Sequence, residues 1–308
     1  MSRRARGVAL ITALLVVAIA TMAATALLSS THVAIHRTAS LRDSEEAWWV
    51  ARGVEAWVLG ILDKDAKDHD YDGLDEAWAQ PVDHLPVDQG FVRGQIADLQ
   101  GRFNLNNLSR DVDTKHDYQK QFETLLRNLP EVTAPLNLVA AIQDWIDADQ
   151  TPSPGGAEDS TYLELNPPYR AANRPFTVVS ELLAVQGMTA EVYDKLKDFV
   201  CALPETTKVN VNTAPVPVLI AVGADATKIA QWESRRKEQP VTNAGEVQNF
   251  IRDYMGPDTR PDQLAFASTY FQIQGEVFVG SSRVALYSLI HRPDPGPPTV
   301  LAHSADAE

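Results

Sequence analysis

The sequence predicts an α+β fold in which one long N-terminal helix packs on a small antiparallel sheet and a helical domain is inserted into that sheet. The first proline is Pro81, so no proline interrupts a helix that begins near Val8. Strand-like alternation occurs in residues 91–108 and again in residues 270–290. The residues between these segments have helical spacing, which places a helical domain inside a sheet domain.

The chain starts with a basic leader followed by an apolar segment. Met1–Arg6 carries three arginines and no acid, and residues 8–30 contain no charged residue, no proline and no glycine. Roughly 20 apolar residues in a helix span a bilayer, and basic residues remain on the cytoplasmic side. We therefore expect a single transmembrane segment with a cytoplasmic N-terminus and the bulk of the chain on the opposite side.

The residues of this start leave three interpretations open. A secretory signal has an apolar region of about 7–15 residues, shorter than this one, although Ala24-Thr25-Ala26 could serve as its cleavage site. An uncleaved membrane anchor is the second interpretation. In the third, the basic leader ending in Gly7 resembles that of type IV pilins and type II secretion pseudopilins, which prepilin peptidase cuts after the glycine. Val8 would then be the new N-terminus.

Beyond the membrane the helix becomes amphipathic. Apolar residues recur there at helical spacing, at Ala47, Ala51, Val54, Val58 and Ile61. This stripe needs a sheet to cover it, and we expect the periplasmic helix and the first strands to occupy residues 31–108. Gly101 separates two strand-like runs in this region.

An acidic segment, residues 63–79, ends the helix. Four of its residues have the spacing of the start of an EF-hand loop: Asp68, Asp70, Asp72 and Gly73. An EF-hand loop needs a bidentate acid at its last position, where this sequence has Ala79. The pattern favours a solvated acidic loop and leaves cation binding there undecided.

The predicted helical domain covers residues 109–267. Its helices are expected at residues 118–129, 136–146, 177–185, 190–202, 215–222, 225–239 and 243–255. Two strands are expected to follow within the range 268–290, at 270–279 and 282–290, because Gly280-Ser281 between them is a hairpin signal. The proline-rich residues 291–308 are expected to form a disordered tail.

The strongest local signal for a ligand is an acidic loop near the middle of the chain. Its sequence from Asp144 to Tyr162 is DWIDADQTPSPGGAEDSTY. One tight turn would bring together four carboxylates, from Asp147, Asp149, Glu158 and Asp159, which repel each other unless a cation neutralises them. Oxygen ligands without His or Cys favour Ca²⁺ over transition metals, with a backbone carbonyl such as that of Thr151 completing the shell. Asn173 is a weaker candidate ligand, and a solvent-exposed acidic loop is the alternative.

A second signal resembles a helix-hairpin-helix unit, a fold that often grips DNA. It begins with VNVNTAPVPVLIAV at residues 209–222. DNA-gripping hairpins have glycine-rich turns whose N–H groups reach phosphates, whereas the turn here has only Gly223 and adds Asp225. The formal net charge of −14 also opposes nucleic-acid binding. We therefore expect a structural helical domain and no nucleic-acid partner, with a membrane-anchored DNA-binding protein as the alternative function.

Nothing in the sequence indicates an enzyme. The G-x-S-x-G, H-E-x-x-H, P-loop and dinucleotide-binding motifs are all absent. The single cysteine, Cys201, has apolar neighbours and is expected in the core. A membrane-anchored calcium-dependent enzyme would need a catalytic pair near the acidic loop, and none is recognisable.

Taken together, these features resemble the GspK family of type II secretion minor pseudopilins, also named XcpX in some systems. The resemblance lies in the leader ending RARG, the long helix, FNLNNL at 103–108, DWIDAD and GGAED within 144–159, YRAANRPF at 169–176, VSELL at 179–183 and VNVNTAP at 209–215. These motifs occur in the family's order and cover most of the chain.

The resemblance implies a pilin-like fold with a large inserted SAM-like, helix-hairpin-helix α-helical domain. It implies cleavage after Gly7, N-methylation of Val8, and structural Ca²⁺ bound by the acidic loop. It also implies a place at the pseudopilus tip with the minor pseudopilins GspI and GspJ, alongside GspH and the major pseudopilin GspG, in the bacterial inner membrane. There the protein would promote initiation and length control of the pseudopilus for the export of folded proteins.

Two residues depart from the general pilin pattern. Most pilins carry a glutamate at the fifth mature position, where it neutralises the N-terminal amine of a neighbouring subunit, and this chain has Thr12. A carboxylate without that partner is costly in the bilayer, so Thr12 fits a subunit with nothing above it. The other departure is Val8, where many pilins have phenylalanine.

Overall fold

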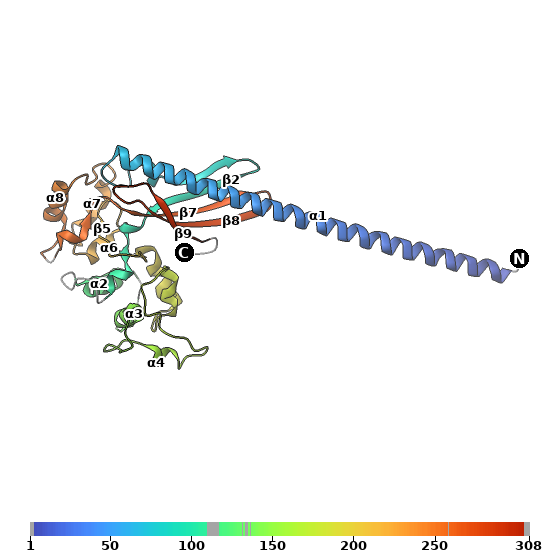
Figure 1. The fold of residues 1–308 in the computed structure, drawn as a ribbon, viewed down its shortest axis with the longest axis horizontal. Helices are drawn as coiled ribbons and strands as arrows, with labels where there is room; N and C mark the ends of the chain where they lie inside the picture. Colours follow the sequence, from blue (N-terminus) through green and yellow to red (C-terminus); the bar gives the residue numbers. More distant parts are fainter. Residues whose placement is uncertain are drawn as a thin grey trace.

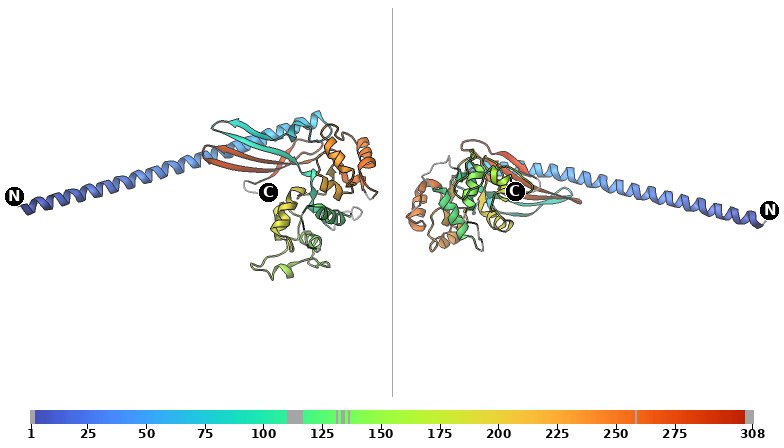
Figure 2. Two further views of the ribbon diagram at one scale, coloured as in Figure 1. Left: turned by 180° about the vertical axis from the view of Figure 1, so that it is seen from behind. Right: turned by 90° about the horizontal axis from the view of Figure 1, so that it is seen from below.

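The computed structural model describes residues 3–109, 117–130, 132, 135, 137–257 and 259–304. Its dominant element is α1, Arg3–Asp68, one continuous helix of 66 residues. The first half of α1 extends away from the rest of the molecule, and the second half lies along the sheet (Figures 1 and 2). The extended half is long and apolar enough to cross a membrane, and its apolar side chains are exposed.

A five-stranded antiparallel sheet lies against the second half of α1 (Figure 1). Its strands, in spatial order, are β1 (Val82–Val87), β2 (Gly90–Asp98), β7 (Tyr270–Val279), β8 (Ser282–His291) and β9 (Thr299–Ser304). The predicted stripe of α1 supplies Ala47, Ala51 and Val58 to a core that also buries Phe271 and Ile273 of β7. The long helix and the hairpin of β7 and β8 are confirmed.

The tail does not follow its prediction. Residues 299–304 form β9, which pairs antiparallel with β8, so the prediction of a disordered tail from residue 291 is wrong at least for these residues. Most of β9 is exposed, so hydrophobic alternation does not mark it, and backbone pairing with the edge of β8 holds it instead. Residues 305–308 lie outside the described part of the chain.

The opposite edge strand, β1, was not predicted either. It contains Pro86, and proline is tolerated in a strand only at an edge or a bulge. The strand pairs with β2 alone, with an irregular register between Val82 and Leu85. Sequence alternation is interrupted by the proline, which explains why the pattern did not indicate a strand here.

The helical domain is inserted between β2 and β7. Its helices are α2 (Tyr118–Asn128), α3 (Leu138–Ile146), α4 (Asp159–Tyr162), α5 (Ala190–Leu196), α6 (Val216–Ala221), α7 (Ile229–Arg235) and α8 (Ala244–Tyr254), with a 3-10 helix at Val179–Ala184. These helices bury a core of their own, separate from that of the sheet.

Two short parallel strand pairs connect distant parts of the helical domain. β3 (Phe103–Asn104) pairs with β4 (Val200–Cys201), and β5 (Val209–Asn210) pairs with β6 (Leu264–Ala265). The helix predicted for residues 190–202 is therefore wrong at its end, because Val200 and Cys201 find backbone partners in β3. Cys201 is buried, as predicted.

A buried polar junction lies where the end of α1 and its loop, β2, β8 and the helical domain meet. It consists of Asp72, Asp98, Asn210, Ser268 and Arg292, all at least nine-tenths buried. The Arg292 guanidinium bonds both oxygens of Asp72 at 2.6 Å. Ser268 Oγ and Asn210 Nδ2 donate to Asp98 Oδ2 at 2.7 and 2.9 Å. This network ties the sheet domain to its insertion.

Candidate metal centre

The acidic loop is built by the end of α3 and a reversal of the chain. α3 ends at Ile146, and Asp147 is its C-cap with an extended backbone. Gly155 has φ +84°, a conformation that favours glycine. A Cβ on Gly156 would overlap the carboxylate of the buried Asp144. The two adjacent glycines thus let the chain turn back tightly and place Glu158 beside the end of α3.

Three of the four predicted carboxylates converge. Asp147, Asp149 and Glu158 each offer an oxygen, and these oxygens lie within 4.8 Å of one another. Asp147 and Glu158 are buried, whereas Asp149 is exposed. The cluster therefore has two buried carboxylates and one exposed carboxylate, and their oxygens are close enough for one cation to contact all three.

Glu158 is the most deeply buried of the three carboxylates. Its side chain is 1% exposed, and neither carboxylate oxygen has a hydrogen-bond partner among the described residues. Burial, together with the nearby charges of Asp147 and Asp144, raises the pKa of Glu158 to about 7. A buried carboxylate without donors is costly unless a positive charge compensates it.

Two further residues that were predicted as ligands, Thr151 and Asp159, lie outside this group of three carboxylates. Thr151 is exposed, and its backbone N–H donates to Asp149 Oδ1 at 2.7 Å, which orients that carboxylate. Asp159 lies outside the group of three: its Oδ1 accepts from the N–H of Ala171 at 3.0 Å, and its Oδ2 lies 3.7 Å from the Arg170 guanidinium.

Asn173 is better placed than its sequence signal suggested. Its backbone has φ +46°, and its Nδ2 donates to the carbonyl of Asp149 at 2.7 Å. Its Oδ1 is buried and has no hydrogen-bond partner in the described part of the chain. This hydrogen bond holds the Asn173 amide group beside the backbone of Asp149, and an amide oxygen is a ligand type that hard cations accept. Long-range folding brings it there, since Asn173 follows Asp149 by 24 positions.

The residues predicted to be processed lie near the start of α1. Gly7 and Val8 fall within the first turns of α1, and Thr12 follows on the same helix with an exposed side chain. Cleavage after Gly7 and methylation of Val8 remain predictions.

The backbone N–H groups of the turn between α6 and α7 donate hydrogen bonds to carbonyl groups of the same chain. Gly223, at φ +109°, donates its N–H to the carbonyl of Ile220 at 3.0 Å. The N–H groups of Ala224 and Asp225 donate to Leu219 and Tyr254 at 2.9 and 2.8 Å. Backbone donors already satisfied in this way do not reach a phosphate, so this turn lacks the geometry that grips DNA.

Comparison with known proteins gives a consistent result. Residues 101–205 match the family described as "Type II secretion system (T2SS), protein K". The type II secretion system protein K of Pseudomonas aeruginosa is 37% identical over 98% of this chain and 93% of the relative. That of Pectobacterium carotovorum is 34% identical over 94% of each.

The fold has a solved counterpart in the crystal structure of the GspK-GspI-GspJ complex from the enterotoxigenic Escherichia coli type 2 secretion system. The match has a TM-score of 0.71 at 28% identity and covers 88% of this chain and 100% of the other. With nearly full-length relatives above 30% identity, this chain belongs to the type II secretion system protein K family of minor pseudopilins.

Proposed function

We propose that this chain caps the tip of a type II secretion pseudopilus, in a complex with the minor pseudopilins GspI and GspJ. The observation that carries the proposal is the contrast between two parts of the chain, the first half of α1 and the helical insertion. The exposed apolar half of α1 can pack beside the helices of other subunits, whereas the helical insertion lies at the opposite end of the sheet and to one side of it (Figure 1). A bulky domain in that position blocks the addition of a further subunit.

Three features support this assignment. The matching chain belongs to a complex whose other members are GspI and GspJ. Thr12 removes the carboxylate that would need a neighbouring subunit in the bilayer. The basic leader and apolar helix favour a single pass through the inner membrane, with the N-terminus in the cytoplasm and the bulk of the chain in the periplasm. GspH and the major pseudopilin GspG would be further neighbours of this chain in the pseudopilus.

The membrane helix enters the assembly after processing. Prepilin peptidase would cut after Gly7, and Val8 would be the methylated N-terminus of the mature chain. Mass spectrometry of the purified protein tests this step. A terminus at N-methyl-Val8 supports it, whereas a terminus near Leu27 or an intact Met1 contradicts it.

The acidic loop would hold structural Ca²⁺. The residues fit this ion because every donor is an oxygen: the carboxylates of Asp147, Asp149 and Glu158, and the buried amide oxygen of Asn173. Bound Ca²⁺ would compensate the buried charge of Glu158 and brace the loop against α3. Calorimetry with CaCl₂ tests the site, and unchanged binding in an Asp149→Ala variant would contradict the assignment.

Association is tested by co-purification from detergent-solubilised membranes. We expect GspI and GspJ homologues to accompany the chain, and their complete absence would count against the tip complex. The alternative, a membrane-anchored DNA-binding protein, is not supported: the family is a secretion family, and the candidate turn has its donors engaged.

A further inference from the structure

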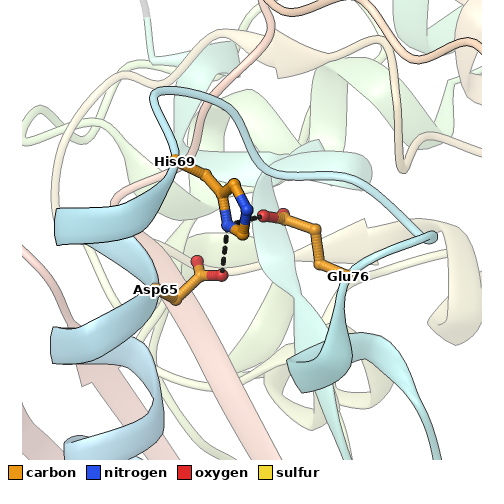
Figure 3. A group of neighbouring side chains, drawn as sticks. All are labelled: Asp65, His69 and Glu76. Carbon is orange, nitrogen blue, oxygen red and sulfur yellow. Dashed lines mark hydrogen bonds and ion pairs between the residues drawn. The ribbon is translucent and has the colours of Figure 1, made fainter.

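A second group of potential ligands lies at the periplasmic end of α1. Asp65 is in its last turns, His69 follows the helix, and Glu76 stands in the loop that leads to the first strand. Figure 3 shows the two carboxylates approaching the imidazole from different elements. His69 Nδ1 lies 3.4 Å from Asp65 Oδ1 and 2.9 Å from Glu76 Oε1.

Each carboxylate is anchored through its other oxygen. Asp65 Oδ2 accepts from Arg292 Nη1 at 3.0 Å. Glu76 Oε2 accepts from the N–H of Gly73 at 2.8 Å and from Trp78 Nε1 at 3.0 Å. The remaining oxygens, Oδ1 and Oε1, are thereby aimed at the same ring nitrogen. Holding ligand oxygens in place through such outer hydrogen bonds is typical of protein metal sites.

Hydrogen bonding inside the group leaves one carboxylate oxygen, Glu76 Oε1, without a hydrogen bond among the described residues. The single proton that Nδ1 can carry serves one acceptor, and the hydrogen-bond geometry is met only toward Asp65, at the long distance of 3.4 Å. Glu76 Oε1 accepts no hydrogen bond from any residue the structure describes, although the Glu76 side chain is only 2% exposed. Burial raises the pKa of this carboxyl, so a cation at Oε1 would offset the cost of burying it.

We propose that Asp65 Oδ1, His69 Nδ1 and Glu76 Oε1 bind a divalent first-row transition metal ion of the Zn²⁺ class. Ligand atoms at about 2.0–2.2 Å from a common ion lie about 2.9–3.5 Å apart, which the distances of 2.9 and 3.4 Å match. An imidazole nitrogen with two carboxylate oxygens suits zinc better than calcium. The half-exposed His69 side chain leaves solvent access for a water ligand.

The local charge balance fits a divalent ion. Asp65 and Glu76 bring two carboxylates to the ligand group, and the Arg292 guanidinium is shared between Asp65 and the neighbouring Asp72. With a neutral imidazole, two negative charges remain for the ion. Bound metal would fasten the loop that carries Glu76 to the end of α1, next to the polar junction.

Isothermal titration of the full chain in detergent with ZnCl₂ tests this site. Saturating CaCl₂ keeps the acidic loop occupied, and a His32→Ala/His36→Ala background removes two exposed imidazoles on α1 whose Nε2 atoms lie 3.1 Å apart and could bind zinc themselves. We expect one zinc ion per chain in this background, and an affinity at least about tenfold lower after His69→Ala.

Two further variants make the result specific. Glu76→Gln should weaken zinc binding while keeping the side-chain shape, and His84→Ala, an exposed histidine stacked on Phe91, should leave it unchanged. Zinc should raise the melting temperature of the background chain and not that of the His69→Ala chain. The proposal is overturned if the background chain binds no zinc, or if His69→Ala binds it with unchanged affinity.

Discussion

The polar junction and the acidic loop both contain buried carboxylates, and they differ in how the charge of these carboxylates is compensated. In the polar junction, Asp72 is paired with Arg292, and Asp98 accepts from Ser268, Asn210 and other donors. In the acidic loop, Glu158 is equally buried, yet its carboxylate oxygens have no hydrogen-bond partner among the described residues. The first cluster carries its own counter-charge in Arg292, and no such partner contacts Glu158 among the described residues.

The difference shows that a count of acids does not identify a cation site. Asp72 and Glu158 both lie in segments rich in aspartate and glutamate, and both are buried. What separates them is the supply of donors from elsewhere in the fold, since Arg292 lies 220 positions from Asp72. A buried carboxylate oxygen without a donor, rather than a high number of acidic residues, is the feature that makes a place a candidate for a cation.

The largest expected effect comes from removing the internal counter-charge. Arg292→Met leaves Asp72 buried without its partner, and breaking a buried pair from one side costs about 3–5 kcal/mol. Urea unfolding monitored by circular dichroism measures the change. Arg283→Met is the matched control, because Arg283 is exposed and pairs with Glu276 at the surface; we expect a loss below about 1 kcal/mol. Equal losses in both variants would remove the distinction.

The acidic loop, proposed to bind calcium, should show the opposite behaviour. In EGTA, Glu158→Gln should be more stable than the unmodified chain by about 1–3 kcal/mol, because it removes a buried charge that lacks donors. In saturating CaCl₂ the order should reverse, since the variant binds the ion more weakly. Thermal unfolding of both chains in both buffers tests this reversal of the order of stability. A variant that is less stable in EGTA as well would argue against a charge that calcium compensates.

A pH titration measures the contribution of the buried Asp72 carboxyl. Burial outweighs the opposing effect of the Arg292 charge and raises the pKa of Asp72 to about 6. A carboxyl with a higher pKa in the folded chain binds its proton preferentially there, so its contribution to stability rises as pH falls from 7 toward 5. The gain is about 1.5 kcal/mol. Urea unfolding of the unmodified chain and of Asp72→Asn at both pH values isolates it; identical pH dependence in the two chains would contradict the assignment.

The smallest effect should come from the surface pair beside the acidic loop. Arg170 is exposed and lies 3.7 Å from Asp159 Oδ2, and such pairs contribute little. Arg170→Gln should change the free energy of unfolding by less than about 0.5 kcal/mol and leave calcium affinity unaltered. A large loss of affinity would mean that this pair supports the ligands more closely than its exposure suggests.

Much of the fold could be predicted from local pattern. The proline-free start of α1, its apolar stripe and the Gly280-Ser281 hairpin all act through near neighbours in sequence, so their periodicity is visible directly. The same holds for the acidic loop, where Gly155 and Gly156 allow the reversal that brings Glu158 to the end of α3. Family membership also follows from the sequence, because its motifs lie in order along most of the chain.

The tertiary structure decided what depends on distant partners. β9 exists because the edge of β8 accepts it, and Val200-Cys201 leaves the helix because β3 is available to pair. The same reason governs the charges: Asp72 is neutralised by Arg292, Asn173 is carried to Asp149, and Glu76 is directed at His69 by hydrogen bonds from Gly73 and Trp78. Sequence periodicity records which face of an element is buried, whereas the partner a buried polar group finds depends on chain segments that meet only after folding.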